Sequence, residues 1–335
     1  MSVLGAGSWG TALAIAVSHN VKKVKLWGRN TASMNEMQST RENKRYLPGV
    51  TLPQNLEIEP SLSNLIDSAL CFLIVVPSHA FSHTLESLHN EIIRRDYNPD
   101  DATIVWGTKG FEPRSGELLG DVARKIFGSH AKRAIVSGPS FAKETAISLP
   151  TALTTASANM DQAKSLAHWF RTPSTRVYHS DDIIGVQIGG AVKNIMAIAA
   201  GISDGLGYGA NARAALITRG LSELTRLGLA LGGRSETFMG LTGVGDLILT
   251  CTDNQSRNRR FGLGVGQGKS QAEITKEIGQ EIEGIQTVKE LYMISEKLNV
   301  DMPITEQVYR VLHLGDDPKI AVQRLLQRNP KAETT

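Results

Sequence analysis

Near its N-terminus the chain reads Val3-Leu-Gly-Ala-Gly-Ser-Trp-Gly10, which matches Gly-x-Gly-x-x-Gly at Gly5, Gly7 and Gly10. Apolar residues precede the glycines, and a run suited to a helix follows at residues 11–17. In a dinucleotide-binding turn Gly5 lets the chain leave a strand sharply, Gly7 lets a pyrophosphate approach the backbone, and Gly10 lets the helix pack against the strand. The helix N-terminus also attracts phosphate. The glycines alone fit an ordinary strand-to-helix turn, but their flanks favour a nucleotide site.

Composition and charge narrow the class of protein. A length of 335 residues suggests two domains. The net charge of +3 suits small anionic substrates, and no basic run with interleaved aromatics points to nucleic-acid binding. Cys71 and Cys251 show neither disulfide nor metal spacing, so we expect a cytoplasmic protein without a metal site. The apolar stretch 183–202 contains Gln187 and Lys193, so we expect no stable membrane insertion.

Strands and helices are predicted to alternate through residues 1–179. The run 69–76 is apolar throughout, as expected of a strand buried on both faces of a parallel sheet. Residues 41–60 contain Pro48 and Pro53 and are predicted to form a loop or small hairpin. Further strands are expected at 23–27, 103–106, 133–136, 151–156 and 175–178, with helices at 31–38, 80–94, 117–127 and 160–170. This alternation predicts an α/β fold with a Rossmann-like, doubly wound, mostly parallel sheet.

Arg29 stands just after the second predicted strand, about twenty residues beyond the glycines, where an acidic residue binds the ribose 2′-hydroxyl of NAD. A guanidinium at this place suits a 2′-phosphate and favours NADP over NAD. A solvated arginine at a strand end is the alternative.

Polar residues follow three other predicted strands at the edge where open α/β sheets bind ligands. His79 follows strand 69–76, and Lys109 lies between two glycines after strand 103–106. Gly138 and Ser140 follow strand 133–136; the glycine permits close backbone approach, and the serine is expected to cap a short helix. Taken singly, His79 is equally compatible with a solvent-exposed loop position, and a lysine such as Lys109 is more often a surface residue.

From residue 180 onward the pattern becomes helical, which predicts an all-helical domain over 180–335 after a Rossmann domain over 1–179. The first helix is expected to run to about 201, capped by Ser180 or Asp181. Its Gly189, Gly190 and Lys193 share one face, forming a groove for a ligand or strand end beneath a lysine. Close packing with the lysine extended to water is the alternative. A buried lysine is rare without a partner, so we favour function. Further helices are expected at 212–231, 271–279, 287–298 and from residue 303.

Two polar segments follow in the helical half. Asp246 precedes a predicted helix and, taken alone, is interpreted as its N-cap. Thr250 lies four residues later on the same face. Arg257 and Asn258, in the basic stretch 254–260, are suited to a phosphate, although such a stretch also fits a solvated charge run.

Taken together, six motifs resemble the bacterial type of NAD(P)-dependent glycerol-3-phosphate dehydrogenase over the whole chain. They are Gly-Ala-Gly-Ser-Trp-Gly-Thr-Ala at 5–12, Trp-Gly-Thr-Lys-Gly at 106–110, Ser-Gly-Pro-Ser-Phe-Ala at 137–142, Ala-Val-Lys-Asn at 191–194, Gly-Val-Gly-Asp-Leu at 243–247 and Ser-Arg-Asn-Arg-Arg-Phe-Gly at 256–262. The resemblance implies reversible reduction of dihydroxyacetone phosphate to sn-glycerol 3-phosphate, which supplies phospholipid synthesis. It also implies a homodimer that uses NADP, as the preferred cofactor, or NAD.

The resemblance further implies roles for individual residues. Those implied to bind the cofactor, besides Gly5, Gly7 and Gly10, are Ser8, Trp9, Arg29, Lys109, Ala142, Arg257, Glu281 and Glu283. Those implied to bind the substrate are Lys109, Gly138, Ser140, Lys193, Asp246, Ser256, Arg257 and Asn258, to which the shared helix face adds Thr250. The family tends to be apolar where this chain has Glu281, so a contact there would use the backbone.

The expected chemistry centres on Lys193, Lys109 and Asp246. When a hydride adds to a ketone, negative charge grows on its oxygen, and a cation and a proton donor are needed. Lys193 is expected to serve as both, and as the general base in oxidation. A free lysine has a pKa near 10.4, so burial or the charge of Lys109 must lower that of Lys193, while Asp246 orients its ammonium. No metal is needed.

Two other classes of protein remain open on the sequence. A 3-hydroxyacid or 6-phosphogluconate type of dehydrogenase also pairs a Rossmann half with a helical half, but the basic stretch at 256–260 favours a phosphate-bearing triose. A non-catalytic nucleotide sensor would keep the glycines without needing Lys109, Lys193 and Asp246 together.

Overall fold

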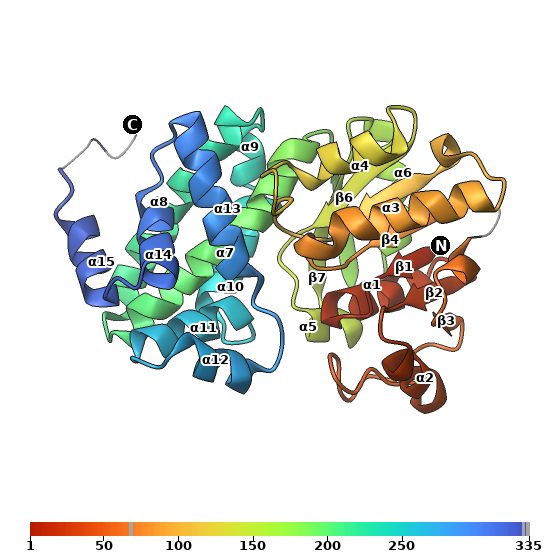
Figure 1. The fold of residues 1–335 in the computed structure, drawn as a ribbon, viewed down its shortest axis with the longest axis horizontal. Helices are drawn as coiled ribbons and strands as arrows, with labels where there is room; N and C mark the ends of the chain where they lie inside the picture. Colours follow the sequence, from red (N-terminus) through yellow and green to blue (C-terminus); the bar gives the residue numbers. More distant parts are fainter. Residues whose placement is uncertain (67–69, 330–331, 333–335) are drawn as a thin grey trace.

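The computed structural model describes residues 1–66, 70–329 and 332 and has two lobes side by side along the long axis of the molecule (Figure 1). One lobe is a sheet covered by helices, and the other is a bundle of helices. The α/β fold class and the change to a helical second half are therefore confirmed.

The described strands of the first lobe form one sheet in the order β3-β2-β1-β4-β5-β6-β7-β8. Their bounds are β1 (Ser2–Leu4), β2 (Val24–Trp27), β3 (Leu56–Glu59), β4 (Cys71–Ile74), β5 (Thr103–Trp106), β6 (Lys132–Ser137), β7 (Thr151–Ala156) and β8 (Thr175–Ser180). All neighbours pair in parallel except β6 and β7, so the carboxyl ends of β1 to β6 meet at one edge. The predicted mostly parallel sheet is confirmed; Ala69, where the predicted β4 begins, lies outside the described residues.

Helices cover both faces of this sheet. Phe72 and Ile74 pack on the side of α3 and α4, whereas Leu73 packs on the side of α1 and α6, because successive side chains of a strand point to opposite faces. The bounds are α1 (Ser8–Ser18), α2 (Thr31–Thr40), α3 (Ser78–Arg94), α4 (Leu119–Phe127), α5 (Ala142–Ala146) and α6 (Met160–Phe170), with short 3₁₀ turns η1 (Ser63–Leu65) and η2 (Pro99–Asp101). A doubly wound sheet of this kind places its ligand site at the carboxyl edge.

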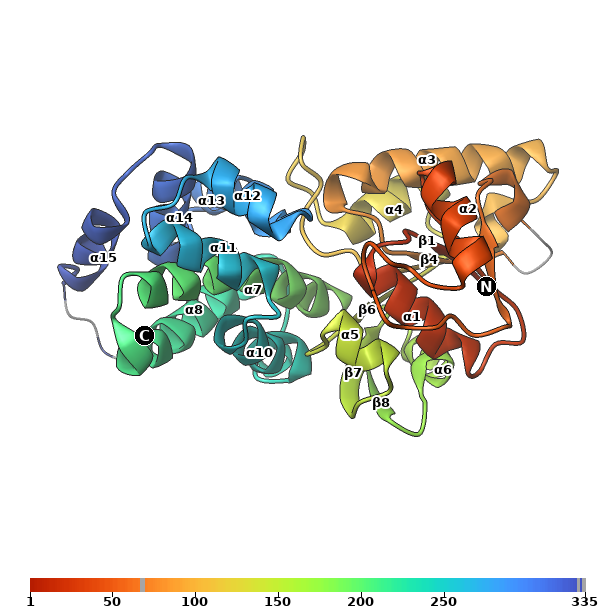
Figure 2. The same cartoon turned by 90° about the horizontal axis from the view of Figure 1, so that it is seen from below.

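The second lobe is built around α7, which is buried almost throughout. It lies next to α8, α11 and α13 (Figure 2). Its bounds are α7 (Ile183–Gly205), α8 (Gly209–Ala230), α9 (Ser235–Phe238), the π-helical turn η3 (Leu241–Gly245), α10 (Asp246–Thr252), α11 (Arg257–Gly266), α12 (Gln271–Ile278), α13 (Glu283–Leu298), α14 (Pro303–His313) and α15 (Pro318–Leu326). By length and composition α7 is apolar enough to cross a membrane, but 89% of its most apolar window is buried in the protein, as in a core helix.

Several local expectations differ from the structure. Residues 41–60 include the antiparallel pairing of a small hairpin, between Glu42 and Thr51, but they also contain strand β3, whose alternating Leu56 and Ile58 bury one face against the core. α11 and α15 were not expected; α11 forms despite three glycines, because Gly262 and Gly266 allow close contact with α7 and Gly264 packs against Ile274 of α12. The cap of α7 is Asp182, which accepts a hydrogen bond from Gly185 N at 2.8 Å, rather than Ser180 or Asp181.

Candidate active site

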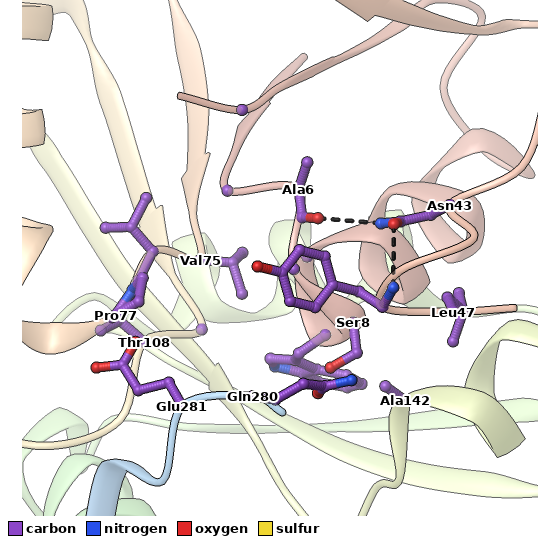
Figure 3. A pocket seen from close by; sticks show the side chains of 18 of the residues that line it. Ala6, Ser8, Asn43, Leu47, Val75, Pro77, Thr108, Ala142, Gln280 and Glu281 are labelled. Carbon is purple, nitrogen blue, oxygen red and sulfur yellow. Dashed lines mark hydrogen bonds between the residues drawn. The ribbon is translucent and has the colours of Figure 1, made fainter. Parts of the chain in front are cut away.

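A cleft of about 870 Å³ lies between the two lobes. Its lining runs from the glycine turn after β1 to Glu283 at the start of α13, so both lobes contribute. In Figure 3 Gln280, from the second lobe, lies near Ser8 and Ala142 of the first, and Glu281 lies near Pro77 and Thr108. The volume falls within the usual range of small-molecule sites.

The glycine turn has the geometry that a pyrophosphate needs. Gly5 has φ +121°, and a Cβ there would lie 2.5 Å from Val75 O. A Cβ at Gly10 would lie 1.9 Å from Gly5 O, so the start of α1 packs directly on the turn. A Cβ at Gly7 would meet open space for 4 Å among the described residues, leaving its backbone accessible from the cleft. The turn therefore fits a dinucleotide, whose phosphates would meet the N-terminus of α1.

Asn43 supports this turn, although no sequence pattern indicated it. Its amide nitrogen donates to Ala6 O at 3.0 Å (Figure 3) and to Thr11 Oγ1 at 2.8 Å. Its amide oxygen accepts from Tyr46 N at 3.2 Å. The segment after α2 is thereby held against the cofactor end of the cleft.

Arg29 lies on the cleft wall after β2 and is exposed. Another cation of the same wall, Arg45, stacks over the ring of Tyr46 with its guanidinium carbon 5.1 Å from the ring centre. This end of the cleft is therefore positively charged, as a ribose phosphate requires.

Lys109, Lys193 and Asp246 meet at the opposite end of the cleft. Asp246 Oδ2 accepts from Lys109 Nζ at 2.9 Å, and its Oδ1 accepts from Lys193 Nζ. Thr250 Oγ1 donates to Asp246 O at 2.6 Å. Asp246 is fully buried and Lys193 is 6% exposed, so the lysine does not extend to water. Asp246 is the first residue of α10 and does not cap it, because Gly245 occupies the N-cap position.

Burial and mutual charge shift the pKa values of these three groups. Burial lowers the pKa of Lys193 to about 7; Asp246 opposes this shift, and the charge of Lys109 adds to it. Burial also acts to lower the pKa of Lys109, but Asp246, the contact with Lys193 and the charge of Glu283 together outweigh it, and the pKa is raised overall. Burial acts to raise the pKa of Asp246, and the two lysines lower it below its usual range. Lys193 is thus suited to exchange a proton near neutral pH, while Lys109 remains a cation.

The helix face beneath Lys193 shows both the close packing and the fit to a strand end that the sequence suggested. A Cβ at Gly189 would lie 2.1 Å from Thr242 O, so this glycine serves close helix packing. A Cβ at Gly190 would lie 3.2 Å from the hydroxyl of Ser137, the last residue of β6. The end of the strand therefore fits over the small residues.

The basic stretch becomes the N-terminus of α11 and faces the cleft. Ser256 is its N-cap, and its Oγ accepts from Arg259 N at 3.2 Å. Arg257 Nη1 donates to Gln280 Oε1 at 3.4 Å. Asn258 Oδ1 accepts from Gly284 N at 3.0 Å, so its amide nitrogen is the end with hydrogen-bonding capacity for a ligand.

The other predicted site residues divide into two groups. Ser8, Trp9, Ala142, Ser140 and Glu283 line the cleft. Gly138 has φ +142°, and a Cβ there would lie 2.9 Å from Ala152 O, so the glycine is required by the sheet. The expected capping by Ser140 is wrong, because α5 has Phe141 as its N-cap.

Two further residues of the cleft differ from expectation or were missed. Glu281 Oε1 lies 3.1 Å from His79 Nδ1 across the lobes, so its side chain pairs with α3. Asn194, which the sequence analysis did not select, lines the cleft directly after Lys193 and is buried. Its place beside Lys193 was the signal that could have found it.

A dinucleotide-binding turn that shares a cleft with a buried lysine–carboxylate centre is the arrangement of a two-domain nicotinamide-dependent dehydrogenase. The family models for the N-terminus and C-terminus of NAD-dependent glycerol-3-phosphate dehydrogenase match residues 1–163 and 182–323. The chain therefore belongs to the NAD-dependent glycerol-3-phosphate dehydrogenase family, which confirms the resemblance.

Known proteins agree with this assignment. The chain is 51% identical over 335 residues to the NAD(P)+-dependent glycerol-3-phosphate dehydrogenase of Shewanella frigidimarina, covering 100% of this chain and 97% of that protein. The solved structure of glycerol-3-phosphate dehydrogenase from Coxiella burnetii is 46% identical, with a TM-score of 0.93 and 98% of each chain covered. The Saccharomyces cerevisiae glycerol-3-phosphate dehydrogenase structure is 27% identical, with a TM-score of 0.82, 98% of this chain and 99% of that chain covered.

Proposed function

We propose that the protein reversibly reduces dihydroxyacetone phosphate to sn-glycerol 3-phosphate with NADPH or NADH, with Lys193 as general acid and base. The observation that carries this proposal is the pairing of Lys193 and Lys109 with one buried carboxylate, Asp246, in the cleft that holds the dinucleotide turn. The product supplies the glycerol backbone of phospholipids, and the enzyme acts in the cytoplasm.

The first lobe binds the cofactor. The N-terminus of α1 holds the pyrophosphate, and Arg29 pairs with the 2′-phosphate of NADP. When bound, the reduced nicotinamide supplies the hydride. The remaining residues proposed to contact the cofactor are Ser8, Trp9, Lys109, Ala142, Arg257, Glu281 and Glu283.

The substrate phosphate binds at the N-terminus of α11. The Ser256 hydroxyl accepts a backbone hydrogen bond and keeps its own proton to donate, and Arg257 brings a guanidinium to the same place. Asn258 adds its amide nitrogen. Gly138, Ser140 and Thr250 complete the proposed substrate set around the ketone.

Proton transfer takes place at Lys193 Nζ. As the hydride forms the new carbon–hydrogen bond at the carbonyl carbon, the carbonyl π-electrons move to oxygen, and Lys193 donates a proton to it. The permanent cation of Lys109 stabilises the developing charge, and Asp246 holds both ammonium groups in place. In the reverse direction neutral Lys193 takes the hydroxyl proton.

The domain division proposed at residues 179/180 falls where β8 ends and before α7 begins at Ile183. A homodimer is proposed from the family resemblance. Sedimentation of the purified protein at twice the monomer mass of 36.2 kDa supports it, whereas sedimentation at the monomer mass contradicts it.

The proposed reaction is tested by absorbance at the reduced-nicotinamide band. We expect rapid NADPH oxidation with dihydroxyacetone phosphate, and a kcat/KM lower by about 1,000-fold with dihydroxyacetone, because the phosphate supplies binding energy to the reaction. Formation of glycerol 3-phosphate in equal amount identifies the product. A chain that oxidises NADPH equally well with both ketones, or with neither, does not carry the proposed function.

Arg29→Asp is expected to reverse the cofactor preference. The change removes the guanidinium that pairs with the 2′-phosphate and adds a carboxylate suited to the ribose hydroxyls, so the kcat/KM ratio of NADPH to NADH should fall by about 100-fold. Steady-state kinetics with both cofactors at saturating ketone measure this ratio. Lys44→Asp is the matched control, since Lys44 pairs with Glu36 at 3.3 Å. An unchanged ratio in Arg29→Asp means that Arg29 does not read the phosphate.

A further inference from the structure

Arg259 lies two residues beyond Arg257 but is buried behind the cleft wall, with 7% of its surface exposed. We propose that Arg259 is a positioning residue, which holds the N-terminus of α11 at a fixed place relative to Lys193 and so sets the affinity for the substrate phosphate. The inference rests on the phosphate site proposed above.

One planar guanidinium joins three segments of the second lobe. Arg259 Nε donates to Cys251 O at 2.9 Å, at the end of α10. Its Nη1 donates to Asn254 Oδ1 at 2.5 Å, in the loop that leads to Ser256. Its Nη2 donates to Asp204 Oδ2 at 2.5 Å, in the last turn of α7. Because these donors lie in a fixed plane, the side chain defines the geometry of all three acceptors together.

The segments that Arg259 joins carry the proposed active site. α7 bears Lys193, α10 bears Asp246, and the loop bearing Asn254 ends at the cap of the phosphate site. Figure 2 shows α7, α10 and α11 next to one another in the second lobe. A shift of this loop therefore changes the distance between the proposed phosphate site and Lys193.

Backbone packing makes the joint between α7 and α11 rigid. A Cβ at Gly201 would lie 2.1 Å from Arg259 O, and a Cβ at Gly262 would lie 2.0 Å from Ile198 O. Gly205 and Gly266 make similar approaches, to Leu263 O and Ile202 O, at 2.4 Å each. Lys193 stands eight residues before Gly201, about 12 Å along the same helix. Helix α11 thus packs closely against α7, the helix that bears Lys193. Arg259 holds the loop that precedes the N-terminus of α11.

Arg213 provides the comparison that separates positioning from general stabilisation. It donates to the same oxygen, Asp204 Oδ2, at 2.8 Å from α8. Among the described residues its hydrogen-bond partner is on α7, whereas Arg259 also holds Cys251 and Asn254. Loss of either arginine weakens the ion pair with Asp204, but only loss of Arg259 releases the loop of the phosphate site.

The test compares Arg259→Gln with Arg213→Gln in the full-length protein. We expect Arg259→Gln to raise the KM for dihydroxyacetone phosphate by about tenfold or more, because small displacements of a binding group are costly to an oriented reaction. The Kd for NADPH, from its fluorescence, and the kcat/KM for dihydroxyacetone should each stay within about threefold of wild type. Arg213→Gln should leave the KM for dihydroxyacetone phosphate within about twofold.

Asn254→Ala keeps the proposal testable should Arg259→Gln not fold, because it removes one loop contact and leaves the buried ion pair intact. It should raise the same KM by about threefold. The inference is overturned when the KM for dihydroxyacetone phosphate does not rise, when Arg213→Gln raises it equally, or when turnover of dihydroxyacetone falls by the same factor.

Arg257→Gln, measured alongside, separates this inference from the phosphate site itself. A raised KM in Arg257→Gln with an unchanged KM in Arg259→Gln and Asn254→Ala overturns the positioning role alone. An unchanged KM in Arg257→Gln overturns the phosphate site and the inference with it.

Discussion

Lys193→Met is expected to lower kcat/KM for dihydroxyacetone phosphate by about 10,000-fold, because one side chain supplies both the proton and charge stabilisation at the ketone oxygen. Lys193 is buried in the cleft, and burial lowers its pKa to about 7, as a proton donor at neutral pH requires. Methionine matches the length of the stem and leaves Asp246 paired with Lys109, so the variant should fold. Steady-state oxidation of NADPH measures the loss.

The control for this variant is Lys143→Met, which removes an exposed lysine from the mouth of the same cleft. Its kcat/KM should remain within about threefold of wild type. The Kd for NADPH should change by no more than about twofold in Lys193→Met, since the loss concerns chemistry rather than cofactor binding. A Lys193→Met enzyme that keeps more than about a tenth of wild-type kcat/KM excludes Lys193 as the acid.

Asp246→Asn is expected to lower kcat/KM in the reduction direction by about 100-fold at pH 7. The carboxylate is fully buried and accepts hydrogen bonds from both lysines, so its loss removes the bonded counter-charge of the buried Lys193 ammonium and of the partly buried Lys109 ammonium. Asp246 opposes the fall in the pKa of Lys193, so that pKa should move further below about 7. Less of the proton donor is then present at neutral pH.

The pH dependence of kcat/KM gives this prediction a sign. Oxidation of glycerol 3-phosphate needs neutral Lys193, so in the wild type it should rise with pH and level off above about 7. Reduction needs the protonated form and should fall through the same range. In Asp246→Asn both midpoints should move to lower pH. Asp161→Asn, with a side chain 93% exposed, is the control. Midpoints that do not move contradict the role of Asp246.

Local patterns predicted much of the first lobe. Strands β5 and β7 and helix α6 have the predicted bounds, because their hydrophobic patterns depend only on residues that are consecutive in the chain. The separate roles predicted for the glycines of the turn are also visible in the structure. At Gly5 and Gly10 a neighbouring backbone lies too close for a side chain to fit. Strand β3 was not predicted, because it has only four residues and lies inside a polar, proline-containing segment, where the alternation of apolar residues is weak.

In the helical lobe, local sequence patterns failed to predict one of the helices that form the site. Gly262, Gly264 and Gly266 argue against a helix by propensity, yet α11 forms there because Gly262 and Gly266 contact the backbone of α7. No local pattern predicted the roles of Asn43 and Arg259, since each acts through partners brought close by the fold.

Asp246 shows most clearly the difference between what local sequence patterns predict and what tertiary contacts add. Sequence patterns predicted most of the sheet, the nucleotide turn, the helical second half and, through the six motifs, the family. Taken locally it offered Asp246 as a helix cap, because a pattern registers neighbours only a few residues away. The tertiary structure decided otherwise by bringing Lys109, 137 residues distant, and Lys193, 53 residues distant, to the same carboxylate. The burial of Lys193, together with the charges of Asp246 and Lys109, then set the pKa of Lys193, and all three causes depend on contacts between distant parts of the chain.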